Sequence, residues 1–318
     1  MNYEQGLVSV IIPTYKRADS LKKTIDSVLN QTYGNIEVLI VNDNVSGDEY
    51  SLQLRHLLSE IPDKRVKLVE QEKHINGAAA RNAGIRVAKG EYISFLDDDD
   101  TWEKEKIERQ IVILGKLDDS WGAVSCLIKT YSNGSLLRCA LPYRSGNILL
   151  DILQRRTGLG MGSLLIRREA LDQCGYFDEK LRRHQDLQLF AFLTEKYKIW
   201  LEPVYLYNVE IGDAQNRPTA EKLVQIKKEY FESISRIMDA LPAKEQKLIY
   251  ALHNFEQAYA FFKERKYREV AVRIFAVIKS PKAVYLSVER SARKTIEKRF
   301  KHRLEKKYSL QGKKNDDR

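Results

Sequence analysis

A short apolar run that ends in four consecutive carboxylates constrains the fold of this chain more than any other feature. Residues 91–96 are mostly apolar and read as a buried strand, and residues 97–100 are all aspartate. In open α/β sheets, ligands bind beyond the carboxyl ends of the strands. Four acids placed together repel one another, so a divalent cation such as Mg²⁺ or Mn²⁺, which also holds phosphates, would stabilise them. The alternative is that the acids cap a helix expected after residue 100, although a cap needs only one of them.

The first half of the chain alternates between strand-like and helix-like segments. Apolar, β-branched runs at residues 8–12, 37–41 and 66–69 predict buried strands, with Pro13 ending the first of them. Amphipathic segments separate these runs. The alternation favours right-handed βαβ units and an α/β fold whose Rossmann-like, mostly parallel sheet is flanked by helices. The GxGxxG and P-loop fingerprints of classical dinucleotide-binding proteins and ATPases are both absent.

The second half of the chain changes from a mixed pattern to a helical one. Strand-like runs at residues 124–128 and 162–166 enclose a short helix predicted at 148–153, and the segment 182–186 leads into another helix. After residue 219 nearly all apolar residues recur at helical spacing. We therefore predict three parts: an α/β domain over residues 1–215, a helical extension over 216–280, and a basic amphipathic helix or tail over 281–318.

The positive charge of the chain is concentrated near residue 318. Of the net charge of +10, residues 279–318 supply 14 Lys/Arg against 5 Asp/Glu, and the rest is nearly neutral. Apolar residues recur every fourth position from Val284 to Tyr308. We expect residues 281–310 to bind an anionic membrane surface. A helix that packs its stripe on the domain and a partner-binding helix are the alternatives. Nucleic acid is disfavoured because aromatic residues are sparse in this segment.

Cysteine usage and the first residues of the chain predict a cytoplasmic protein. The three cysteines, Cys126, Cys139 and Cys174, are widely spaced and form no CxxC pair, which is typical of reduced cysteines. The first residues lack the basic and apolar regions of a signal peptide, and no run approaches the ~18 apolar residues of a membrane span. We expect a peripheral protein at the inner face of the plasma membrane.

Five short motifs occur together in the order typical of one enzyme family. They lie at residues 8–15, 41–43, 80–84, 95–100 and 183–186. In this order and spacing they resemble the family 2 glycosyltransferases with the GT-A fold, particularly bacterial enzymes of surface-polysaccharide assembly. The resemblance covers residues 7 to 210. It implies a nucleotide-diphosphate-sugar donor with UDP as the expected nucleotide, a glycan or lipid-linked acceptor, and inverting chemistry that depends on Mn²⁺ or Mg²⁺.

The same resemblance assigns roles to individual residues. Asp186 matches the general base, which would take the proton from the acceptor hydroxyl. Asp97 and Asp99 form the DxD pattern, with Asp99 expected on the metal and Asp97 on the ribose or bound through water. Asp98 would point elsewhere, because neighbouring side chains alternate in extended chain. Further residues expected around the donor are Pro13, Thr14, Tyr15, Asp43, Arg81 and Asp98. Those expected near the acceptor or the diphosphate are Arg183, His184 and Gln185.

Each of these assignments also has a purely structural alternative. Residues 13–15 form a plain turn in that interpretation, and Asp43 is an ordinary loop residue. Arg81 is then a solvated helix residue, Asp186 caps the following helix, and His184 is a packing residue. A useful base is expected to have its pKa moved toward neutrality by partial burial.

One departure from the family pattern concerns the metal. Many relatives place a late histidine near the metal or the diphosphate, and no histidine occurs here between His184 and His253. Asn208, Glu210 and Asp213 are the candidates to replace it. They belong to a segment over residues 208–218 that we expect to close over the donor.

Two other classes of function stay open from the sequence. A sugar-nucleotidyltransferase shares the sheet architecture but needs a glycine-rich, basic loop after the first strand, and residues 13–17 are not glycine-rich. A non-catalytic membrane scaffold of the same fold would have lost the acids, and Asp97, Asp99 and Asp186 are all present. A homodimer formed through the helices is also left open.

Overall fold

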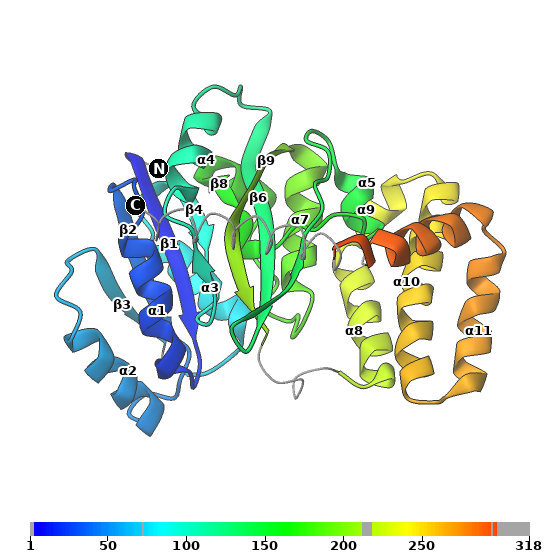
Figure 1. Ribbon diagram of the computed structural model, residues 1–318, viewed down its shortest axis with the longest axis horizontal. Coiled ribbons are helices and arrows are strands. Elements are labelled where there is room, and N and C mark those ends of the chain that lie inside the picture. The colour runs from blue at the N-terminus through cyan, green and yellow to red at the C-terminus, as the bar shows by residue number, and fades with distance from the viewer. Residues whose placement is uncertain (1–2, 72, 212–217, 294, 298–318) are drawn as a thin grey trace, which may run out of the picture.

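The chain folds into a sheet-containing part with a helical lobe beside it (Figure 1). The lobe contains α8 (Ala220–Ser233), α10 (Ala243–Lys263) and α11 (Tyr267–Ile278). A last helix, called the C-terminal helix below (residues 281–293 and 295–297), runs back toward the sheet. The predicted α/β fold with a helical extension is confirmed. This computed structural model describes residues 3–71, 73–211, 218–293 and 295–297.

The nine strands within the described residues form one sheet in the order β3-β2-β1-β4-β8-β6-β9-β5, with β7 paired to β6. The first four strands of this order pair in parallel, as predicted. Beyond them the sheet is mixed, because β8 runs antiparallel to β4 and β6 whereas β9 runs parallel to β6. The strands are β1 (Glu4–Thr14), β2 (Ile36–Asn42), β3 (Val66–Glu70), β4 (Gly90–Phe95), β5 (Thr101–Trp102), β6 (Trp121–Ser132), β7 (Ser135–Cys139), β8 (Leu165–Arg167) and β9 (Lys198–Glu210).

Alternation along β1 sends apolar side chains to both faces of the sheet. Val8, Val10 and Ile12 pack with α1, α2 and α4, whereas Ile11 packs with α3, α6 and α7 on the other face. The α3 helix approaches β1 closely at Gly84, where an added Cβ atom would lie 2.5 Å from the Ile11 side chain. These helices are α1 (Ala18–Leu29), α2 (Glu49–Ser59), α3 (Gly77–Val87), α4 (Lys106–Leu114), α6 (Arg168–Cys174) and α7 (Gln185–Lys196).

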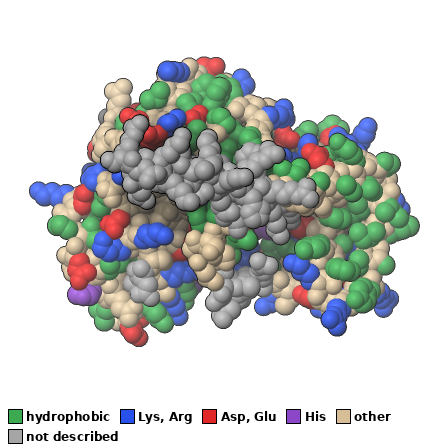
Figure 2. Space-filling model, viewed as in Figure 1, with side chains coloured by type: hydrophobic (Ala, Val, Ile, Leu, Met, Phe, Trp, Pro, Cys, Tyr) green, Lys and Arg blue, Asp and Glu red, His purple; other side chains and the backbone are tan. Residues whose placement is uncertain are grey.

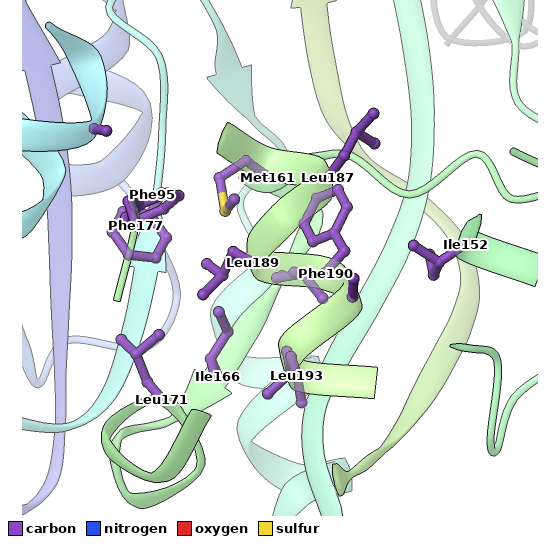
Figure 3. Packing of buried hydrophobic residues seen from close by; sticks show 14 of the residues in the cluster. Phe95, Ile152, Met161, Ile166, Leu171, Phe177, Leu187, Leu189, Phe190 and Leu193 are labelled. Atoms are coloured by element: carbon purple, nitrogen blue, oxygen red, sulfur yellow. The ribbon is translucent and has the colours of Figure 1, made fainter. Parts of the chain in front are cut away.

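The helical lobe shares its core with the sheet-containing part. Tyr230 of α8 and Ile249 of α10 belong to the same buried cluster as Phe190 of α7. Figure 3 shows this cluster around α7, where Phe177 meets Phe95 of β4 edge-on at 5.3 Å between ring centroids. Packing therefore fixes the lobe against the beginning of α7. The remaining elements are α5 (Leu149–Leu153), a 3₁₀ helix (Met161–Ser163) and α9 (Ser235–Ala240).

Three predicted elements differ in the structure. Pro13 lies inside β1 and does not end it, because pairing with β4 stops at Ile11 and no ladder partner then requires an N–H from Pro13. The strand expected at 162–166 is the 3₁₀ helix followed by β8. The helix expected directly after Asp100 begins only at Lys106, since the intervening β5 pairs with β9.

Apolar side chains are exposed across α10, α11 and the C-terminal helix, and Figure 2 shows many of them gathered over this lobe. The apolar stripe of the C-terminal helix is exposed as well: Val288 is 64% and Ile296 49% accessible. The alternative in which this stripe packs on the domain is therefore wrong for the described residues; residues 298–318 lie outside them. The aromatic residues of the α10–α11 hairpin that are more than half exposed are Tyr259, Phe262, Tyr267 and Phe275.

None of the three cysteines forms a disulfide, as predicted, and each is buried or half-buried. Within the described ranges, no helix combines the length and the apolar character needed to cross a membrane.

Candidate active site

The four aspartates after β4 lie in a turn and not on the strand. The backbone N–H of Asp100 donates to the carbonyl oxygen of Asp97 at 3.1 Å, which closes a four-residue turn. Asp97 and Asp99 keep 46% and 28% of their side chains exposed, whereas Asp98 and Asp100 are buried. Asp98 therefore points away from its neighbours because of the turn, and not because of strand alternation as predicted. Residues 97–100 are called the acidic turn below.

Asp98 and Asp100 hold the acidic turn against the sheet. Asp100 accepts hydrogen bonds from the Tyr207 hydroxyl and from the backbone N–H of Glu210 (2.9 Å), both on β9. Burial raises the pKa of Asp100 to about 8. Burial likewise raises the pKa of Asp98 to about 6, opposed by a hydrogen bond from the side chain of Thr14. Neither residue caps a helix, so the capping alternative is wrong.

The two exposed acids of this turn each contact an arginine. Arg81 donates to Asp97 at 2.6 Å, and Arg17 contacts Asp99 and lies 3.6 Å from Asp98. These ion pairs offset the mutual repulsion of the carboxylates. Sequence reasoning missed Arg17, whose only signal was its place just after the first motif.

A stacked pair of rings lies at the ends of β1 and β2. The Tyr15 ring, which is 39% exposed, stacks on the His74 imidazole at 4.1 Å between centroids. His74 also lies 3.1 Å from the carboxylate of Asp43, which is buried and accepts from Gln71 at 2.9 Å. Burial raises the pKa of Asp43, and its hydrogen bonds oppose this shift. The N–H of Asp43 donates to the Thr14 carbonyl oxygen at 3.0 Å, so the first two motifs are in contact. His74 carried no motif in the sequence.

Arg81 joins the acidic turn to the beginning of α7. Besides Asp97, its guanidinium donates to the side-chain oxygen of Gln185 (3.4 Å) and to the carbonyl oxygen of Gly77 (3.3 Å). Its carbon Cζ lies 5.7 Å from the centre of the Phe177 ring, and only 15% of the side chain is exposed. The solvated-helix interpretation of Arg81 is therefore wrong.

Asp186 lies in the first turn of α7 with its side chain exposed. The helix begins at Gln185 after His184, and no side chain caps it, so Asp186 is not the predicted cap. The partial burial expected of the base is also absent. Asp186 instead lines a pocket of about 360 Å³ between β6, β9, the segment after α5 and the C-terminal helix.

The three residues before the expected base have different surroundings. Gln185 is buried and contacts Arg81. His184 packs edge-on against the Tyr230 ring at 5.8 Å, and burial together with neighbouring cations lowers its pKa to about 3. Arg183 is exposed. Gln185 is thus linked to the acidic turn through Arg81, while neutral His184 supports the packing of α8.

The candidates for an additional metal ligand differ in what they contact. Glu210 accepts from the N–H of Gly134 at 3.3 Å, whereas Asn208 donates to Glu103 at 3.2 Å and its buried side-chain oxygen has no hydrogen-bond partner among the described residues. Asp213 and most of the expected flap lie outside the described residues. Within those residues, no three Asp, Glu, His or Cys side chains converge as a metal-binding group.

Comparison with known proteins identifies the family. A family model described as Glycosyl transferase family 2 matches residues 9–174. An uncharacterized glycosyltransferase of Rickettsia prowazekii is 32% identical over 271 residues, which are 82% of this chain and 81% of that protein. The chain belongs to glycosyl transferase family 2. As a family 2 glycosyltransferase, it transfers a hexose from a nucleotide-sugar donor.

Two further proteins resemble this family 2 glycosyltransferase. The UDP-Glc:alpha-D-GlcNAc-diphosphoundecaprenol beta-1,3-glucosyltransferase WfaP of Escherichia coli is 39% identical over 105 residues, which are 33% of this chain and 40% of that protein. The mannosyltransferase PcManGT of Pyrobaculum calidifontis, solved in complex with GDP-Man and Mn²⁺, has a TM-score of 0.56 and 20% identity, covering 90% of this chain and 79% of that one. This likeness confirms the predicted GT-A fold.

Proposed function

We propose that the chain transfers a hexose from a UDP-sugar to a hydroxyl of a lipid-linked sugar, with inversion at the transferred carbon. The contact set of Arg81 carries this proposal. One guanidinium pairs with Asp97 of the acidic turn and reaches Gln185, the residue before Asp186. Arg81 therefore links the acidic turn to the first turn of α7, which carries Asp186.

The acidic turn fits a divalent cation. Asp97 and Asp99 present partly exposed carboxylates, which are the hard oxygen ligands that Mg²⁺ and Mn²⁺ prefer. Such ions commonly take only one or two protein carboxylates together with substrate phosphates. A cation held by these two residues would supply positive charge for the departing diphosphate. Arg17 and Arg81, which neutralise the two acids here, would then turn their guanidinium groups toward the phosphate oxygens.

Asp186 acts as the general base in this proposal. Its exposed carboxylate borders the pocket that would receive the acceptor. It takes the proton of the acceptor hydroxyl as that oxygen bonds to C1 of the donor sugar and the bond from C1 to the diphosphate oxygen breaks. Attack from the side opposite the leaving group inverts the configuration. At the nucleotide end of the site, the exposed Tyr15–His74 stack offers an aromatic surface for the uracil ring of the donor.

The lipid-linked acceptor is supported by a relative and by the surface of the lobe. The name of the Escherichia coli relative WfaP specifies a diphosphoundecaprenol-linked acceptor. On this chain, Tyr285 and Val288 are 68% and 64% exposed, and Lys279 lies 4.4 Å above the exposed Phe275 ring. Apolar rings flanked by long basic side chains suit an anionic bilayer surface. We place the enzyme at the cytoplasmic face of the membrane, bound peripherally through this lobe and residues 281–310.

Calorimetry with UDP, GDP and CMP, each with Mn²⁺ and with EDTA, tests the donor half of the proposal. We expect one nucleotide, UDP, to bind in a Mn²⁺-dependent manner and to lose affinity in Asp99→Ala. Asp239→Asn, an exposed acid on α9, is the matched control and should bind as the wild type does. Absence of binding to all three nucleotides by correctly folded protein would favour the non-catalytic scaffold.

Cosedimentation with vesicles tests the membrane half. We expect the wild type to bind vesicles that contain phosphatidylglycerol and not those of phosphatidylcholine alone. Tyr285→Ser combined with Val288→Ser should weaken that binding without a change in thermal stability, because both side chains are exposed. Equal binding to both kinds of vesicle would contradict the electrostatic contribution.

A further inference from the structure

The pocket beside Asp186 is lined by arginines and is called the arginine pocket below. Its volume of about 360 Å³ falls within the range of small-molecule sites. The C-terminal helix presents one face to it, through Leu286, Arg290, Arg293 and Glu297, which recur at steps of three or four residues. The exposed apolar stripe occupies another face of the same helix. One helix thus borders both the pocket and the exposed surface of the lobe.

Positive charge exceeds negative charge around Glu256, which does not line the arginine pocket but interacts with two arginines that do, Arg155 and Arg290. Lys227, with 2% of its side chain exposed, donates to Glu256 at 2.9 Å, and Arg155 Nε lies 3.9 Å from the same carboxylate. Arg290 also faces the charge of Glu256, and no described carboxylate comes within ion-pair distance of it. Although burial opposes the shift, these three cations hold the pKa of Glu256 well below its ordinary value. One carboxylate is therefore shared by three cations in a place that water screens poorly.

Arg155 and Arg290 differ from the other arginines of the pocket in what they contact. The buried Nε of Arg155 has no hydrogen-bond acceptor among the described residues, and a buried donor without an acceptor costs free energy. By contrast, Arg293 donates to the carbonyl oxygens of Leu141 (3.1 Å) and Pro142 (2.6 Å), so it anchors the C-terminal helix.

The remaining arginines of the pocket face carboxylates on the C-terminal helix. Arg156 lies 3.9 Å from Glu289, and Arg138 lies 3.9 Å from Glu297. These outer charges balance in pairs. Among the described residues Arg293 donates only to carbonyl oxygens, and Arg155 and Arg290 share Glu256 with Lys227. These three arginines therefore carry the excess positive charge of the pocket.

We infer that the arginine pocket binds the phosphate or diphosphate carried by the acceptor sugar, with Arg155 and Arg290 as its partners. The inference rests on the proposed function, since Asp186 of the same pocket would face the reacting hydroxyl of that acceptor. Planar guanidinium groups match phosphate oxygens in charge and geometry. A neutral glycan would leave the excess positive charge uncompensated. The acceptor class is accordingly a sugar that bears a phosphate or diphosphate, and the pocket holds both its anionic end and its hydroxyl.

Calorimetry of the full chain with inorganic pyrophosphate in EDTA tests the inference. Without metal, no cation bridges pyrophosphate to the acidic turn. We expect one binding event that is weakened at least tenfold in Arg290→Gln and less in Arg290→Lys, which keeps the charge but loses the planar fork. Arg290→Gln should fold, because Glu256 retains Lys227 and Arg155, and thermal unfolding checks this.

Two control variants locate the binding event. Arg268→Gln changes an exposed arginine on α11, and Arg81→Gln changes the arginine of the acidic turn; both should bind pyrophosphate as the wild type does. Wild-type protein that binds no pyrophosphate, or a loss confined to Arg81→Gln, would overturn the inference. If Arg290→Gln does not fold, unchanged affinity in folded Arg290→Lys would overturn it as well.

The same variants separate the acceptor phosphate from lipid headgroups and from the donor. Arg290→Gln should bind phosphatidylglycerol vesicles as the wild type does. If Arg290→Gln lost vesicle binding but kept its affinity for pyrophosphate, Arg290 would be a residue that binds lipid headgroups, and the inference would be overturned. Mn²⁺-dependent UDP binding should persist in every pocket variant. Its absence from the wild type would instead mark a failure of the proposed function, because pyrophosphate is measured without metal.

Discussion

The acidic turn and the arginine pocket, which Asp186 lines, differ in how their charges are balanced. In the acidic turn each exposed acid has its own arginine, Arg81 for Asp97 and Arg17 for Asp99. In the arginine pocket, three cations share Glu256. In the balanced region, the arginines are free to bind a phosphate only when a metal ion replaces them as the partners of the carboxylates. A region with excess positive charge is already prepared for an anion. Donor binding should therefore depend on metal, and binding of the acceptor phosphate should not.

Substitution of Asp186, the proposed base, should have the largest effect on turnover and should leave substrate binding in both regions unchanged. Asp186→Asn is expected to lower kcat by about 10²–10⁴-fold, the usual contribution of a general base. The KM values for donor and acceptor should both stay within about twofold of wild type, since a factor of two corresponds to well under 1 kcal/mol. Steady-state kinetics with each substrate varied in turn gives both quantities. A large rise in either KM would instead place Asp186 in that binding region.

Loss of the shared carboxylate should destabilise the protein more than loss of one of its cations. Glu256→Gln leaves Lys227, Arg155 and Arg290 without an anion and is expected to lower the free energy of unfolding by about 3–5 kcal/mol. Lys227→Met leaves Glu256 with two arginines and should cost less. Urea unfolding of both variants measures the order. Equal losses in the free energy of unfolding for the two variants would contradict an excess of positive charge around Glu256.

Substitution of one arginine in each region should separate the two substrates. A hydrogen bond to a charged group contributes about 1.5–3 kcal/mol, or about tenfold to a hundredfold in affinity. Arg81→Gln is expected to raise the KM for the donor by that factor and to leave the KM for the acceptor unchanged. Arg290→Gln should do the reverse. Both KM values rising in both variants would show that the two regions act as one site.

The buried histidines of the lobe should give the smallest effect, as a dependence of stability on pH. Burial first, and then Lys227, lowers the pKa of His253 and of His184 in the folded protein. Their contribution to stability is therefore present above the unfolded pKa of about 6.5 and is lost as pH falls toward the folded values.

The variant His253→Gln tests this contribution. Between pH 6.5 and pH 5 each histidine is expected to remove about 1–2 kcal/mol, at 1.36 kcal/mol per pH unit. His253→Gln keeps a donor for the Leu153 carbonyl oxygen, which His253 contacts at 2.9 Å, and should flatten the decline. Urea unfolding at several pH values measures the slope. An unchanged slope would mean that His253 is protonated in the folded state.

The position of the acidic turn beside the first two motifs was predictable from the sequence, because the order of the parallel strands brings these segments to the same edge of the sheet. Once the first strands are recognised as parallel, Thr14, Asp43 and Asp97 must follow neighbouring strand ends. The partners of these residues were not predictable. His74 occupies an irregular loop, and Tyr207 reaches Asp100 from 107 residues away. No local sequence pattern predicts either of these contacts.

The arginine pocket could not be predicted at all. Arg155 has a left-handed backbone, with φ of +58°, in a short segment after α5. Arg290 lies on a helix whose sequence shows an apolar stripe and many basic residues, but not which of those basic residues face the domain. Packing of the lobe against α7 brings the two together, and such packing between distant helices leaves no periodic signal. The expected burial of Asp186 failed for the same reason, since the C-terminal helix leaves room beside it.

The C-terminal helix, which lines the arginine pocket, lies outside the segment that matches the family model. The segment that matches the family model ends at residue 174, before Asp186 and before every pocket residue on the C-terminal helix. Exchange of this last helix between related chains would alter the wall of the arginine pocket while the acidic turn stays intact. If the arginine pocket binds the acceptor as we infer, acceptor preference can change among relatives while donor chemistry is kept, and chimeras joined after α11 are the natural units for redesigning it.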